Sequence, residues 1–107
     1  MSLHPRSVSY AFQLFLSEAP AHAQAWNTAV NELRAVSALD PKTTQLAFLA
    51  VLAALGRESG LPFHVGLAKK AGATREEVIS ALLVGLPAAG TVVTAALPAA
   101  LTAYDAE

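Results

Sequence analysis

The 107-residue sequence contains no cysteine, and this single absence excludes several kinds of chemistry. Disulfide bonds, thiolate-ligated metals and thiol nucleophiles all require a cysteine sulfur, so none of them can form within this chain. The absence does not by itself assign a cellular compartment, because proteins of either redox environment can lack cysteine.

Charged side chains are also scarce. They make up 14% of the sequence, against roughly 25% in an ordinary globular domain, whereas 54% of the residues are hydrophobic. The basic residues are scattered and the net charge is −1, so the chain offers no electrostatic surface for a nucleic acid. A domain of this size buries only about two thirds of its unfolded surface, so the apolar excess predicts a homo-oligomer with a large apolar interface.

Residues 1–23 imitate a secretory signal peptide, with a basic start, a short apolar run and small residues after it. Gln13 interrupts the apolar run, however, and Phe12, Phe15 and Leu16 recur at helical spacing. We therefore favour an amphipathic helix that packs on one face, in a cytoplasmic protein.

A second amphipathic helix is predicted over residues 21–36, where apolar residues recur at the same spacing. We expect Phe12 and Trp26 to anchor the core or a subunit interface. His4 and His22 have no acidic or histidine partner at metal-ligand spacing, so we expect both to be solvated and predict no metal site.

The clearest helix signals lie between Asp40 and His64. Asp40 is a good N-cap and Pro41 suits the first helical position, so a helix should begin there. No residue between Thr43 and Gly56 is charged, and the segment is apolar on most of its circumference. We expect this helix to be buried in protein nearly all round, since it is too short to cross a bilayer.

A break is predicted after this helix. Gly56 weakens it, and Ser59 followed by Gly60 suggests a new start with Ser59 as the N-cap. His64 would then lie near the beginning of the second helix. Arg57 can approach His64 whether the helix is broken or continuous.

The remaining sequence predicts further helices and no strand. A left-handed cap at Gly72 should end one helix, and a capping box from Thr74 to Glu77 should begin the next. Residues 78–104 are uncharged and long enough to span a membrane, but Pro87 and Gly90 favour two helices joined by a kink or turn. We therefore predict an all-α single domain over residues 1–107, a bundle of about five to six helices without a membrane span.

His64 is the leading candidate for chemistry, because imidazole can give and take a proton near neutral pH. Arg57 offers a planar positive charge suited to a carboxylate, or it could form an ion pair with Glu58 or another acidic residue. Gly60 could leave room for a ligand one turn before His64. Glu58 could orient a neighbouring basic group or serve only as an exposed carboxylate at a helix end. A purely structural histidine is the alternative for His64.

Residues 39–64, AGATREEVISALL at 71–83 and the alanine-rich tail resemble the carboxymuconolactone decarboxylase family, which includes thiol peroxidases of the alkylhydroperoxidase D type. The peroxidase motif is a glutamate, eleven further residues, and then Cys-x-x-Cys-x-x-x-His. If His64 is aligned with that histidine, Gln45 replaces the glutamate, and Arg57 and Gly60 replace the cysteines. The chain is therefore similar to the non-redox branch, and the resemblance implies an alkylhydroperoxidase D-like fold assembled as trimers or hexamers.

The resemblance implies three alternatives for function. The first is a cofactor-free lyase or isomerase, specifically a carboxy-lyase, that acts on a small carboxylate-bearing lactone or unsaturated acid. In it His64 transfers the proton, Arg57 holds the carboxylate and Gln45 hydrogen-bonds the ligand or His64. The second is a non-catalytic acid-binding or degenerate oligomeric module. The third, a thiol peroxidase, is disfavoured because the chain has no cysteine.

Overall fold

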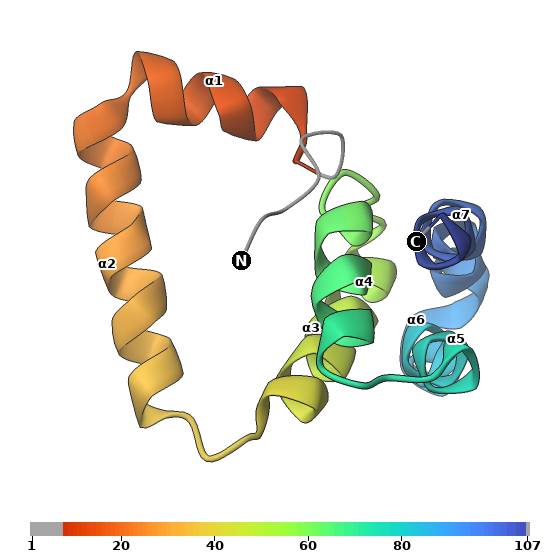
Figure 1. Ribbon diagram of the computed structural model, residues 1–107. Coiled ribbons are helices and arrows are strands. Elements are labelled where there is room, and N and C mark those ends of the chain that lie inside the picture. The colour runs from red at the N-terminus through yellow and green to blue at the C-terminus, as the bar shows by residue number, and fades with distance from the viewer. Residues whose placement is uncertain (1–7, 107) are drawn as a thin grey trace.

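The computed structural model describes residues 8–106, and within this range the chain is helical and contains no strand (Figure 1). The all-α fold expected from the sequence is therefore confirmed. The helices run, in order, α1 (Tyr10–Glu18), α2 (Pro20–Val36), α3 (Pro41–Leu55), α4 (Leu61–Lys70), α5 (Arg75–Leu83), α6 (Leu86–Ala89), the 3₁₀ helix η2 (Gly90–Ala96) and α7 (Leu97–Asp105).

Helix α3 begins and ends where local chemistry predicts. The Asp40 carboxylate accepts a hydrogen bond from the Thr43 amide at 2.8 Å, and Pro41 occupies the first turn. Gly56 adopts a left-handed conformation with φ of 69°, and the next amide, that of Arg57, donates back to the Leu52 carbonyl at 2.9 Å. These bonds form a Schellman ending, which turns the chain sharply away from the helix axis.

Helix α4 is separate from α3, as the predicted break requires. Its N-cap is Gly60, so the prediction of Ser59 as the capping residue is wrong by one position. Gly60 has no side chain to cap the helix, and the Leu61 amide instead donates to the Glu58 carbonyl at 3.1 Å. At the other end of α4 the chain turns through Gly72, whose φ is 99°.

Residues 75–105 form the one described stretch that is long and apolar enough to cross a membrane by length and composition. It is not a single straight helix, because the chain breaks after α5 and again at Gly90, where φ is 81°. Helix α7 returns to pack against α4 and α5 (Figure 1). The predicted kink between Pro87 and Gly90 is confirmed, and the capping box of Thr74 and Glu77 starts α5 as expected.

The core lies between α3 and α4 on one side and α5, η2 and α7 on the other. Its fully buried large side chains are Leu49, Leu61, Val65, Val78, Leu82 and Val93. Alanines fill the narrower places between these helices, which lets their backbones approach closely.

Polar links at the rim tie the same helices together. Lys42 of α3 pairs with Glu77 of α5 at 3.0 Å, and Arg75 of α5 pairs with Asp105 of α7 at 2.9 Å. The Tyr104 hydroxyl donates to the Ala73 carbonyl at 2.8 Å. These groups are exposed or half-buried and are screened by solvent, so the ion pairs contribute little and the apolar core holds the bundle.

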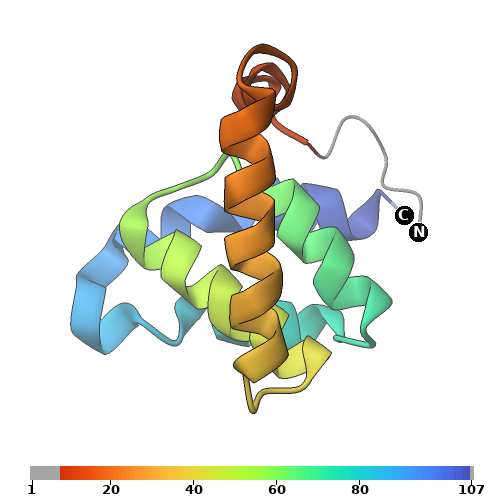
Figure 2. The ribbon, with the colours of Figure 1, turned by 90° about the vertical axis from the view of Figure 1, so that its left-hand side faces the viewer.

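Helices α1 and α2 form an arm that stands apart from this bundle (Figures 1 and 2). They pack on each other, but neither has more than marginal contact with any helix of the bundle. Phe12 and Trp26 are exposed and are not core residues of the single chain. Helix α3 is likewise exposed along its outer side, so the expectation that it is buried nearly all round is wrong for one copy of the chain.

Candidate functional site

His64 lies in α4 against the neighbouring helix α3. Its Nδ1 atom is 2.9 Å from the side-chain oxygen Oε1 of Gln45, so the two residues that the sequence comparison aligned with a family motif form a hydrogen-bonded pair. An amide oxygen can only accept, so the Nδ1–H of His64 donates. This bond fixes the tautomer of the neutral ring, in which Nε2 carries the lone pair.

Two phenylalanine rings enclose the imidazole. Phe48 of α3 stacks on it with ring centroids 4.0 Å apart and an interplanar angle of 22°. Phe63 meets it edge-on, with centroids 5.0 Å apart and an angle of 81°. The ring of His64 is therefore held in one orientation by one hydrogen bond and two aromatic contacts.

These surroundings change the protonation of His64. Burial lowers the pKa of His64 from its usual 6.5 to about 4, because the charged imidazolium loses hydration that no neighbouring carboxylate replaces. The ring is therefore neutral at pH 7. It can accept a proton or a hydrogen bond at Nε2, but it holds no stored proton for a reaction while the site is empty.

Arg57 and Glu58 lie in the loop between α3 and α4, and both side chains are exposed. Within residues 8–106 they form no ion pair with each other, and neither forms a hydrogen bond with His64. The structure thus brings Gln45 to His64, and it leaves Arg57 and Glu58 as free side chains near the start of α4.

Gly60 lies beside the imidazole ring. A methyl group added at Gly60 would be 3.8 Å from the Cδ2 atom of His64 and 3.6 Å from Leu52, which are ordinary contact distances. The Gly60 carbonyl accepts from the His64 amide at 3.2 Å. The space that Gly60 leaves is therefore close to that of one methyl group.

The start of α4 offers few free amides to an anion. The Leu61 amide is used by the Glu58 carbonyl, and Pro62 has no N–H. A bound carboxylate at this end would depend on Arg57 more than on the helix backbone.

No group of three histidine, aspartate or glutamate side chains within the described range lies close enough to hold a metal ion. His22 is exposed on α2, as expected for a solvated residue. His4 lies outside the described residues.

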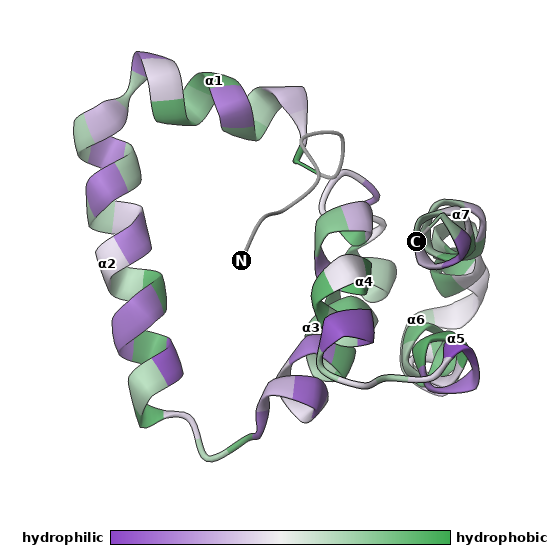
Figure 3. Ribbon diagram, viewed as in Figure 1, coloured by the Kyte–Doolittle hydropathy of each residue, from purple (hydrophilic) through white to green (hydrophobic). Residues whose placement is uncertain are grey.

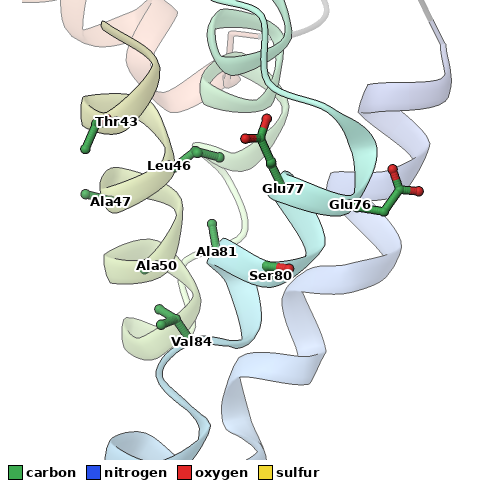
Figure 4. Close-up of a pocket in the computed structure, with 9 residues that line it drawn as sticks. All are labelled: Thr43, Leu46, Ala47, Ala50, Glu76, Glu77, Ser80, Ala81 and Val84. Carbon is green, nitrogen blue, oxygen red and sulfur yellow. The ribbon is translucent and has the colours of Figure 1, made fainter. Parts of the chain in front are cut away.

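A separate apolar groove runs between α3 and α5, with a volume of about 470 Å³ (Figure 4). Leu46 of α3 and Ala81 of α5 lie between the two helices, and Glu76 and Glu77 lie at one end of the groove. The lining includes none of the predicted site residues. The groove is open to solvent, and its polar lining side chains are Thr43, Ser80 and the two glutamates.

Phe48 is a site residue that sequence reasoning did not single out. It follows Gln45 by three positions on α3, and residues at this spacing share a helix face. Once Gln45 is paired with His64, this spacing places Phe48 beside the same ring. The spacing of Gln45 and Phe48 was therefore visible in the sequence, but it pointed to His64 only once α3 was known to pack against α4.

The model of the Carboxymuconolactone decarboxylase family matches residues 20–102, which is most of the chain. No curated protein matches the sequence, and no solved structure matches it. The match begins in α2 and ends in α7, so it includes the Gln45–His64 pair and both helices that carry it.

Proposed function

The chain belongs to the carboxymuconolactone decarboxylase family, and from this premise we propose that it is a cofactor-free carboxy-lyase acting on a small lactone or unsaturated acid. The observation that supports this function best is the partly buried hydrogen bond between His64 and Gln45. The imidazole is neutral, and its tautomer is fixed. It can therefore gain a proton when an anionic substrate binds and later give that proton to a substrate carbon.

The substrate carboxylate supplies the charge that the empty site lacks. An anion within about 4–6 Å favours the imidazolium form and raises the pKa of His64 above about 4. Arg57 holds the same carboxylate, since its guanidinium is free of ion pairs within residues 8–106.

Decarboxylation then breaks the bond between the carboxylate carbon and the ring carbon. The electron pair stays on the substrate, where a conjugated carbonyl accepts it, and neutral carbon dioxide leaves. The negative charge therefore remains on the substrate as a dienolate, and the imidazolium gives its Nε2 proton to the substrate carbon. This protonation removes the anion and returns the pKa of His64 toward its low value. Gln45 keeps the Nδ1 proton in place throughout, and a proton from solvent completes the cycle.

The test is to incubate the pure protein with 4-carboxymuconolactone and related lactone acids and to measure carbon dioxide release. The matched variants are His64→Gln and His22→Gln, because His22 is an exposed histidine on α2. We expect His64→Gln to lose about 100-fold or more in kcat and His22→Gln to retain wild-type turnover. Equal turnover by wild type and His64→Gln would exclude proton transfer by His64.

A non-catalytic acid-binding module is the second candidate. It is favoured by the amide at Gln45, which cannot act as an acid or base, and by the absence of a carboxylate from the contacts of His64 within the described chain. Such a module would be stabilised by lactone acids in a thermal-shift assay, with the ligand recovered unchanged. Stabilisation accompanied by carbon dioxide release would favour the lyase instead.

We further propose that the chain works as a cytoplasmic homo-oligomer, a trimer or hexamer, as its family resemblance implies. Thiol peroxidase activity is not proposed, because the sequence has no sulfur nucleophile. Reduction of alkyl hydroperoxides by metal-free protein in the presence of a dithiol would contradict that argument.

A further inference from the structure

The single chain exposes more surface than a compact monomer of its mass. Its accessible surface is 6909 Å², whereas the scaling for folded monomers gives roughly 5,700 Å² at 11.1 kDa. This total covers all 107 residues, so only part of the excess belongs to the projecting arm of α1 and α2 (Figures 1 and 2). A standard protein interface buries roughly 800 Å² on each partner.

Helix α2 carries an apolar stripe that no helix of the bundle covers. Trp26, Val30 and Leu33 follow one another at spacings of four and three residues, which is the pattern of a helix-packing seam. Trp26 is 57% exposed and Leu33 is 69% exposed. Figure 3 shows hydrophobic and hydrophilic residues alternating along α2, as an amphipathic helix requires.

Helix α3 carries a matching stripe on its outer side. Phe48, Val51 and Leu55 follow one another at spacings of three and four residues, and they are 44%, 56% and 65% exposed. The only charged residue of α3 is Lys42, which is already paired with Glu77 of the same chain. The stripe is therefore an uncharged, helix-shaped surface, and it includes the ring that stacks on His64.

We propose that a second copy of this chain packs the Trp26–Val30–Leu33 stripe of its α2 onto the Phe48–Val51–Leu55 stripe of α3. In a closed symmetric assembly each copy gives one stripe and receives the other, so both exposed stripes of every copy are covered. The uncharged seams bring no like charges together. This inference rests on the proposed homo-oligomer and adds which two surfaces of the chain meet in it.

The α2 helix of the same chain does not fill this role. Its contacts with the bundle are marginal, and the connection to α3 spans only residues 37–40. That connection is held by two hydrogen bonds: the Leu39 amide donates to the Ser37 hydroxyl at 3.2 Å, and the Thr44 hydroxyl donates to the Leu39 carbonyl at 3.4 Å. Within the described chain only α1 packs substantially against α2, so the bundle of the same chain leaves the apolar stripe of α2 uncovered.

The consequence for the site is that the second copy closes it. In a single chain the Phe48 ring that stacks on His64 is 44% exposed to solvent. With a partner's α2 seated on the stripe, Phe48 is buried between that helix and His64. The environment of the imidazole is then completed only in the oligomer.

The test measures the mass of the full chain by size-exclusion chromatography with light scattering. The variants are Val51→Glu and Leu33→Glu, one on each stripe. The matched control is Val84→Glu, because Val84 is 67% exposed but lies in the groove between α3 and α5 instead of on either stripe. Each new carboxylate meets solvent in the single chain, and circular dichroism verifies that the helices remain.

We expect the wild type to have at least twice the 11.1 kDa mass of one chain. Val51→Glu and Leu33→Glu should each weaken association by about 100-fold or more, because an unpaired charge would be buried, and Val84→Glu should not. A wild-type monomer would overturn both the oligomer and this interface. An oligomer that resists both stripe variants, or that Val84→Glu disrupts equally, would overturn the interface alone.

Trp26 provides a second measurement that needs no variant to fold, since it is the only tryptophan in the chain. At concentrations where the oligomer forms, its fluorescence should be blue-shifted and shielded from iodide, and both effects should disappear on dilution to the monomer. Shielding that persists in the monomer would show that the chain's own arm closes onto α3, and the proposal would be wrong.

Discussion

The low pKa of His64 predicts a specific loss of stability in mild acid. The folded protein binds a proton at His64 more weakly than the unfolded chain does, since the pKa is about 4 in one and 6.5 in the other. The contribution of His64 to the free energy of unfolding is therefore fully present above pH 6.5, the pKa of the unfolded chain. It falls as the pH drops below 6.5 and stops falling below about pH 4, the pKa of the folded protein.

The size of this loss follows from the same two values. A shift from 6.5 to about 4 converts to about 3 kcal/mol at full strength. The ring is only partly buried, so solvent reduces the effect, and we expect about 1–2 kcal/mol between pH 7 and pH 4. This is a substantial part of the stability of a small domain, which is typically about 5–15 kcal/mol.

The assay is urea denaturation at pH 7, 5.5 and 4 for the wild type and for His64→Gln, with His22→Gln as the control. Carboxylates titrate in the same range, but they do so in all three proteins, and the difference between variants isolates His64. The wild type and His22→Gln should lose about 1–2 kcal/mol more than His64→Gln. A flat difference, or an NMR titration of His64 centred near 6.5, would refute the account of burial.

Three further changes test the site and its support. Gln45→Glu places a carboxylate beside Nδ1 and should raise the pKa of His64 by about 1–3 units in an NMR titration; an unchanged midpoint would contradict the observed pairing. Gly60→Ala should stabilise the protein by about 0.4–1 kcal/mol in thermal unfolding, since the backbone is helical there and the methyl group fits; a clear loss would show a closer contact. Thr74→Ala removes half of a capping box and should cost about 1 kcal/mol, whereas no change would show that α5 does not depend on its cap.

Helix boundaries were the most predictable part of this fold, because each depends on a few neighbouring residues. Asp40 and Pro41, the left-handed Gly56 and Gly72, and the capping box after residue 73 all act locally, and the structure uses each of them. The misplaced cap before α4 has the same local origin. Backbone hydrogen bonds in the turn took the place of the expected serine side chain.

Exposure of α3 and of the arm could not be predicted in this way. The composition indicated an apolar excess, but composition does not say which helix exposes it. An uncharged helix is predicted to be buried in either case, whether it packs against its own chain or against another copy. The Gln45–His64 pair could be predicted only from the family motif. A separation of nineteen residues does not indicate a contact unless α3 is known to pack against α4.

The amide at residue 45 and the low pKa of His64 are two parts of one arrangement. A carboxylate at this position would hold the imidazolium form and keep the positive charge in the site permanently. The amide of Gln45 accepts the same hydrogen bond without adding a charge, so the ring stays neutral until an anion enters. A site of this kind is charged only while an anion is bound. Decarboxylation leaves the negative charge on the substrate as a dienolate, so the electrostatic attraction ends when the imidazolium protonates the substrate carbon. Gln45 is therefore compatible with the proposed lyase because it is not an acid or base itself.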